Sequence, residues 1–110
     1  MDVYELYNQK AMEMILLAGD GRLSVMQALD ALAEDQDELA TELLNKAYKD
    51  IQEAHKKQTS ILQQIAAGEI EEHYSVLFSH AQDTLMTIYS EYNLAIKLLK
   101  IVSSLKRKIQ

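Results

Sequence analysis

Residues 79–87, Ser-His-Ala-Gln-Asp-Thr-Leu-Met-Thr, place reactive and ligating side chains close together. The imidazole of His80, when neutral, can accept a transferable phosphoryl group. The carboxylate of Asp83 is the kind of ligand that hard divalent cations such as Mg²⁺ prefer. If the stretch is helical, these two side chains lie about 60° apart around the helix axis. The residue types therefore allow phosphoryl transfer, metal binding or simply a polar helix surface.

The composition limits the possible chemistry. The 110 residues are enough for one domain, predicted to span residues 1–110. A net charge of −6 argues against a nucleic-acid partner, because binding phosphate requires clustered Lys and Arg. The basic cluster at 106–108 is predicted to be a solvated helix terminus. The absence of cysteine excludes disulfides, thiolate catalysis and thiolate-bound metals.

The sequence shows no signal for export or for insertion into a membrane. The N-terminus lacks a basic segment followed by an apolar core. The most apolar stretches are far shorter than the roughly 18 residues needed to span a bilayer. These features predict a cytoplasmic protein with no direct membrane insertion.

Apolar and small residues recur at alternating spacings of four and three residues, which is typical of helices packed at shallow angles. The first row is Tyr4, Tyr7, Ala11, Met14, Ala18, Gly21, Val25, Ala28 and Leu32. The second row is Ala40, Leu44, Ala47, Ile51, Ala54, Gln58, Ile61 and Ile65. The third row is Ala81, Leu85, Ile88, Tyr92, Ala95, Leu99 and Val102. With no proline to supply turns, the chain is predicted to be all-α, an antiparallel three-helix bundle.

Capping signals place the helix boundaries. Asp35 followed by Glu38 has the spacing of a capping box, which predicts that Asp35 caps the second helix. Gly68 is expected to end that helix in a left-handed conformation. Ser75 is the predicted N-cap of the third helix.

The Gly-Asp-Gly at residues 19–21 would usually signal a turn. The heptad spacing continues through it, which favours one long helix with a kink over a break. Gly21 then lies in the row that faces the core, where the lack of a side chain permits close backbone approach.

The third helix carries a second, partly apolar row on its opposite side. Its members are Val76, Asp83, Met86, Thr87, Ser90, Leu94, Ile101 and Leu105. A helix of an isolated bundle should present a continuous polar face to water, so this row predicts contacts with other subunits.

Asp83 lies in the middle of this second row, where burial of a carboxylate is costly unless it is paired. The nearest following cation on the same helix, Lys97, is about four turns away. Around a symmetry axis the copies of Asp83 would also repel one another. A raised pKa with shared protons or a bound divalent cation would relieve this repulsion.

Four segments resemble, in this order, the enzyme IIA component of the lactose/cellobiose family of the sugar phosphotransferase system. They are AGDGRLSVMQAL at 18–29, AHKKQT at 54–59, AAGE at 66–69 and HAQDTLMT at 80–87. The resemblance covers roughly residues 14 to 90. It implies a small cytoplasmic protein of three long helices that assembles as a homotrimer.

The resemblance also implies a role for each polar residue of the motif. His80 would be the phosphoryl acceptor, Gln82 a supporting residue, and Asp83 a ligand of Mg²⁺ or another divalent cation shared by three subunits at the trimer axis. The donor would be a histidine phosphocarrier protein, and the acceptor a cysteine of the IIB component. Thr84 stands where the family usually has a histidine, at a position that is neither acceptor nor ligand. The sugar stays open, because the carrier does not touch it.

Other interpretations remain open. His80 could be an ordinary polar histidine at the boundary between two helix faces, in a scaffold or regulatory paralogue that keeps the fold without phosphotransfer. His55 and Gln58 either form a polar layer that fixes helix register or line the active site. His73 is predicted to be an exposed loop residue.

A margin of apolar side chains beside His80 is predicted to contact the partner proteins. Leu77, Phe78 and Ala81 are its expected members. The acidic net charge suits a partner with a basic surface.

Overall fold

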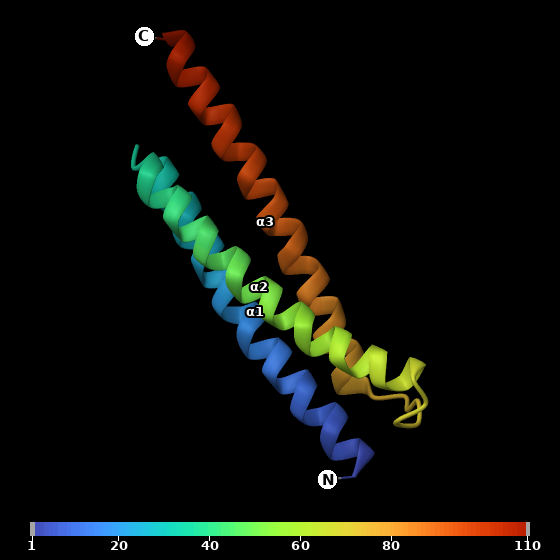
Figure 1. The fold of residues 1–110 in the computed structure, drawn as a ribbon. Helices are drawn as coiled ribbons and strands as arrows, with labels where there is room; N and C mark the ends of the chain where they lie inside the picture. The colour runs from blue at the N-terminus through green and yellow to red at the C-terminus, as the bar shows by residue number, and fades with distance from the viewer. Residues whose placement is uncertain (1, 110) are drawn as a thin grey trace.

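The computed structural model describes residues 2–109, which form three long helices packed as an antiparallel bundle (Figure 1). Helix α1 spans Val3–Ala33, α2 spans Asp37–Ala66 and α3 spans Val76–Ile109. These described residues contain no strand, and the bundle measures 60 × 20 × 19 Å. None of the three helices is long and apolar enough to cross a membrane. The predicted all-α, three-helix architecture is confirmed.

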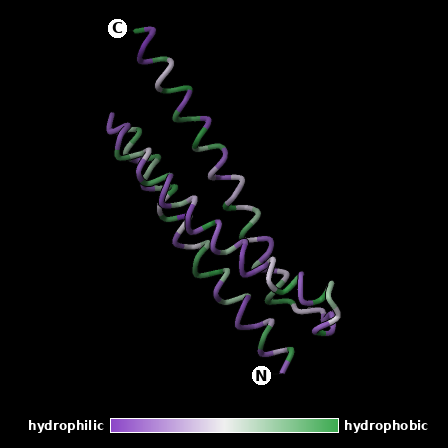
Figure 2. Tube along the Cα trace, viewed as in Figure 1, coloured by the Kyte–Doolittle hydropathy of each residue, from purple (hydrophilic) through white to green (hydrophobic). Residues whose placement is uncertain are grey.

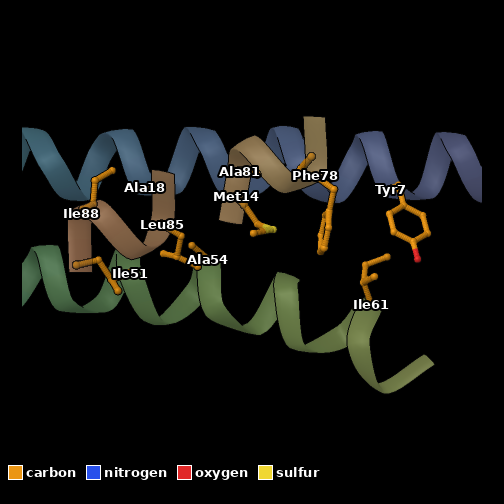
Figure 3. Close-up of a cluster of buried hydrophobic side chains, with 11 residues drawn as sticks. Tyr7, Met14, Ala18, Ile51, Ala54, Ile61, Phe78, Ala81, Leu85 and Ile88 are labelled. Atoms are coloured by element: carbon orange, nitrogen blue, oxygen red, sulfur yellow. The ribbon is translucent and has the colours of Figure 1, made fainter. Parts of the chain in front are cut away.

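The core is built from the predicted heptad rows. Figure 2 shows hydrophobic and hydrophilic residues alternating in short runs along the helices, so each helix has an apolar side to turn inward. Figure 3 shows side chains of all three helices meeting in one cluster. Its buried members are Tyr7, Ala11, Met14, Ala18, Ile51, Ala54, Ile61, Phe78, Ala81, Leu85 and Ile88. A second cluster, around Val25, Leu44 and Ala95, continues the core toward the other end.

The end of α1 differs from the prediction. Asp35 does not cap α2; it adopts a left-handed conformation with φ of 63° and ends α1. The amides of Asp35 and Gln36 donate to the carbonyls of Leu32 and Ala31 at 3.2 and 2.8 Å, the two bonds of a Schellman motif. Aspartate tolerates this conformation better than most residues. The predicted capping box is therefore wrong, and α2 begins at Asp37 without a side-chain cap.

The other two predicted boundaries are confirmed. Gly68 has φ of +74°, and its amide donates to the carbonyl of Ile65 at 3.0 Å in a second Schellman motif. The hydroxyl of Ser75 accepts a hydrogen bond from the amide of Phe78 at 3.0 Å, as an N-cap does. The N-cap of α3 is thus fixed at Ser75, five residues before His80.

Helix α1 runs unbroken through residues 19–21, and its two glycines have different surroundings. A Cβ atom at Gly21 would lie 3.3 Å from Cγ1 of Ile51 and 3.5 Å from the carbonyl oxygen of Ala47. A Cβ atom at Gly19 would meet nothing within 4 Å. The close approach of α1 and α2 therefore depends on the missing side chain of Gly21, as predicted.

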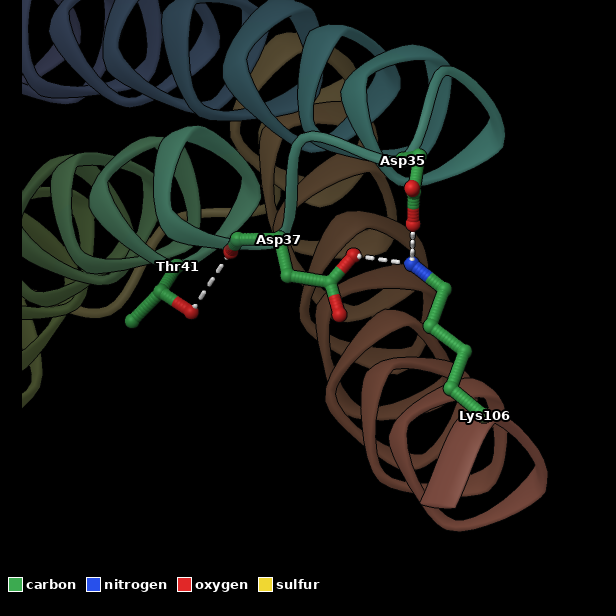
Figure 4. Close-up of polar contacts among 4 residues, drawn as sticks. All are labelled: Asp35, Asp37, Thr41 and Lys106. Atoms are coloured by element: carbon green, nitrogen blue, oxygen red, sulfur yellow. Dashed lines mark hydrogen bonds and ion pairs between the residues drawn. The ribbon is translucent and has the colours of Figure 1, made fainter. Parts of the chain in front are cut away.

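Ion pairs join α3 to the other helices. Arg22 of α1 donates two hydrogen bonds to the carboxylate of Glu91 at 2.9 and 3.2 Å, and this bonding raises the pKa of Arg22. Lys106 bonds to both Asp35 and Asp37, and these hydrogen bonds raise its pKa (Figure 4). Lys106 is therefore not the solvated residue that the sequence predicted; it ties the end of α3 to the α1–α2 turn.

Substitution of the two glycines should have opposite effects. Gly19→Ala should raise the free energy of unfolding by about 1 kcal/mol, because alanine has the higher helix propensity and the space is open. Gly21→Leu should lower it by about 1–3 kcal/mol, because the side chain would force α1 and α2 apart. Urea unfolding followed by circular dichroism measures both changes. Equal stability of the two variants would contradict the close contact at Gly21.

Candidate functional site

His80 lies on α3 just past its first turn, and its side chain is exposed to solvent. The unpaired amides at the start of a helix carry a partial positive charge, which favours an anion nearby. An exposed imidazole in this position can reach a partner protein and hold a phosphoryl group. The predicted acceptor is thus accessible within the chain.

Gln82 does not lie beside His80 in the same chain. Two residues along a helix are separated by about 160° around its axis, so the two side chains leave α3 on nearly opposite sides. Gln82 is half-buried and lines a cavity of about 500 Å³ together with Tyr7, His73 and Phe78. Any support that Gln82 gives to His80 must therefore come from another copy of the chain.

His73 is not the exposed loop residue that the sequence predicted. Its ring packs on Tyr4 with a centroid distance of 4.7 Å and lies edge-on to Tyr7 at 6.3 Å. Its amide donates to the hydroxyl of Tyr7 at 3.3 Å. Tyr4, expected in the core row, is 57% exposed because its ring covers His73 rather than the core. These contacts fix the loop that leads into α3.

The second row of α3 is exposed in the single chain, as predicted. Five of its large apolar side chains are between 51% and 70% exposed: Val76, Met86, Leu94, Ile101 and Leu105. Asp83 lies among them, exposed and without an ion pair to any described residue. Within residues 2–109 of one chain, no three His, Cys, Asp or Glu side chains are grouped to hold a metal. A single chain therefore offers Asp83 alone at this position, as one carboxylate among apolar side chains.

The expected apolar margin beside His80 is absent. Phe78 is 6% exposed and Ala81 is fully buried, because both belong to the core cluster, while Leu77 is half-buried against it. The sequence prediction of a docking surface at these residues is wrong. A partner that reaches His80 has to contact other side chains.

His55 belongs to the contact between α2 and α3. Its ring lies edge-on to Tyr89 at 5.6 Å, and Tyr89 in turn packs on Tyr92. Tyr89 follows His80 by about 13 Å along the helix. Within one chain, His55 thus lies in the contact between α2 and α3, and Gln58 is half-buried on the same helix as His55.

The chain matches the family described as PTS system, lactose/cellobiose specific IIA subunit over residues 9–103. The lactose-specific EIIA component of Lacticaseibacillus casei is 38% identical over 98 residues, which cover 86% of this chain and 87% of that protein. The lichenan-specific phosphotransferase enzyme IIA component of Bacillus subtilis is 33% identical over 97 residues, 88% of this chain and 87% of that protein.

Solved structures agree with these sequence relatives. PtcA from S. mutans superposes with a TM-score of 0.87 at 36% identity, covering 94% of this chain and 99% of that one. The cellobiose-specific enzyme IIA from Bacillus anthracis superposes with a TM-score of 0.86 at 33% identity, covering 98% and 95%.

Proposed function

Because the chain belongs to the lactose/cellobiose-specific IIA family of the sugar phosphotransferase system, we propose that it is a cytoplasmic phosphocarrier whose acceptor is His80. An imidazole nitrogen of His80 attacks the phosphorus of a phosphohistidine on the donor, a histidine phosphocarrier protein. A new N–P bond forms as the donor's N–P bond breaks. The thiolate of a cysteine on a IIB component then attacks, and the imidazole of His80 leaves. The exposure of His80 near the start of α3 is the observation that supports this assignment.

The working form is a homotrimer assembled around α3. The exposed apolar row of α3 would be left in water in a single chain, which costs free energy in proportion to its area. Packing three copies of this row around a threefold axis covers it in each chain. The polar members of this α3 row lie in its N-terminal half, which also contains His80. Its C-terminal half consists of the apolar residues Leu94, Ile101 and Leu105.

In such a trimer, Gln82 supports His80 of a neighbouring subunit. The two residues lie on opposite sides of the row that faces the axis. When three helices pack around that axis, one side of each faces the opposite side of the next. The amide of Gln82 can then donate a hydrogen bond to the phosphoryl oxygens on the neighbour's His80.

Asp83 of each subunit would hold a shared divalent cation, with Mg²⁺ the best match to three carboxylates. The ion offsets the repulsion among the three charges and supplies a structural link at the axis. The chain's own residues carry out the transfer.

The substrate class follows from the relatives rather than from the site. Their names specify lactose, cellobiose and lichenan, so the uptake system served here would take a sugar of the lactose/cellobiose type. A regulatory paralogue without transfer is the second candidate, and Thr84 in place of the usual histidine favours it.

Phosphorylation should depend on His80 alone among the three histidines. Incubation with phosphoenolpyruvate, enzyme I and the histidine phosphocarrier protein should give one acid-labile phosphoryl group per chain. His80→Gln should abolish it without loss of helicity, whereas His55→Gln should retain it. Phosphate uptake by His80→Gln at the wild-type rate would show that another residue is the acceptor. No uptake by the wild type would favour the regulatory paralogue.

Mixed trimers should reveal whether Gln82 acts between subunits. Gln82→Ala should slow phosphorylation by about ten- to a hundredfold, the effect of losing one hydrogen bond to a charged group. Refolding this variant with an excess of His80→Gln chains should restore the rate per remaining His80, because each remaining His80 then lies beside the intact Gln82 of a neighbouring chain. Radiolabel incorporation measures the rate, and an unrestored rate would place Gln82 outside the transfer.

Substitutions of Asp83 should separate charge from packing. Asp83→Leu should leave the trimer intact and insensitive to chelator, because a well-packed apolar residue often replaces a buried charge without loss. Asp83→Lys should break the trimer apart, because three ammonium groups would converge without a counterion. Sedimentation with and without Mg²⁺ measures the assembly. A wild-type protein that is monomeric at micromolar concentration would contradict this arrangement.

A further inference from the structure

Helix α1 carries a second heptad row that the core does not use. Met12, Leu16, Gly19, Leu23 and Met26 follow one another at spacings of four, three, four and three residues. The four large side chains are between 41% and 64% exposed, and nothing lies within 4 Å of the Cβ position at Gly19. We call these five residues the α1 outer row. A helix with two apolar heptad rows is built to pack on both sides.

The α1 outer row lies on the same side of the bundle as His80. Helices α1 and α3 run in the same direction, and the bond between Arg22 and Glu91 marks the edge where they meet. Glu91 follows His80 by about three turns and therefore lies on nearly the same side of α3. Near the starts of α1 and α3, Tyr7 packs edge-on against Phe78 with a centroid distance of 5.4 Å, which sets the register of the two helices. His80 is thus level with the beginning of the outer row.

The surroundings of the row are acidic. Glu5, Asp20, Asp30 and Glu34 are exposed along the same helix and its end. Helix α1 has two basic residues, and both already bind carboxylates: Arg22 bonds to Glu91, and Lys10 lies 3.8 Å from Glu13. Lys57 of α2, which lines a pocket together with Leu16, lies 3.5 Å from the same Glu13. The charge around the row therefore favours a partner whose apolar patch has a basic rim.

We propose that the α1 outer row is the docking surface for the protein that delivers the phosphoryl group to His80. The inference rests on the proposed function and names where the donor binds. It replaces the margin that the sequence placed at Phe78 and Ala81, which are buried. Two of the row's members are methionines, whose unbranched side chains adapt to a surface that binds and releases. A permanent contact with a second copy would instead use the row of α3.

Lysine substitutions in the row test the proposal. Leu16→Lys and Leu23→Lys keep helix propensity and surface exposure but place a cation against a basic rim. Leu39→Lys, at the start of α2 and at the end of the bundle away from His80, is the matched control with 44% exposure. Binding is measured by titration with the unphosphorylated histidine phosphocarrier protein, so that the affinity is measured without phosphoryl transfer. Phosphorylation kinetics and sedimentation are measured on the same variants.

Each row variant should weaken binding by about tenfold or more, as expected for a charge at the centre of an apolar contact. The concentration of donor needed for half the maximal rate should rise equally, with the rate at saturation unchanged. Leu39→Lys should match the wild type. Unchanged binding by both row variants would overturn the proposal, and so would a change in their sedimentation, because the row would then be a subunit contact. A wild type that binds the donor but takes up no phosphate would overturn the proposed function alone.

Discussion

Helix α3 carries apolar side chains on two sides, and α1 and α2 together cover only one of them. Phe78, Leu85 and Ile88 are buried in the core, whereas Val76, Met86 and Leu94 on the other side face solvent. Among the described residues, no further helix covers the second side. The polar groups placed along this side are therefore open to solvent in the single chain. His80, the proposed acceptor, lies at the edge of this side, where it is anchored by the helix and still open to solvent.

The arrangement suits the proposed transfer between two partners. A histidine that exchanges a phosphoryl group needs a rigid base and free access. Rigidity comes from the core under α3, from the Ser75 cap, and from the packing of Tyr4 and Tyr7 around His73 in the preceding loop. Access comes from the outward direction of His80. A tight contact lies at Gly21, where α1 approaches Ala47 and Ile51 of α2 rather than α3.

The regular parts of the fold could be predicted from the sequence because they depend on local spacing. From Tyr7 to Leu32, the predicted core row of α1 is buried, and the caps at Gly68 and Ser75 formed as their types indicate. The errors concern residues whose state is set by distant partners. Asp35 looked like an N-cap, but it ends α1 and bonds Lys106, 71 residues away. The environment of His73 depends on Tyr7, 66 residues earlier.

The candidate site could be predicted only in part, because local spacing places its residues on a helix but not their neighbours in space. His80 and Asp83 could be placed by spacing on one helix, and the structure leaves both exposed. Gln82 is adjacent in sequence but points to the far side of the helix. The α1 outer row follows the same heptad spacing as the predicted core row, and the structure shows that its large side chains are exposed.

The two ends of the chain differ in what they can carry. Helix α1 begins beside the α2–α3 loop, where Tyr4 packs on His73, and α3 runs past the α1–α2 turn at the other end of the 60 Å bundle (Figure 1). A domain fused before α1 would crowd the approach to the histidine. A domain fused after α3 would leave that approach clear and would be held on the bundle by the bridge from Lys106. A partner domain joined after α3 is therefore compatible with open access to His80, on a linker long enough to return along the bundle.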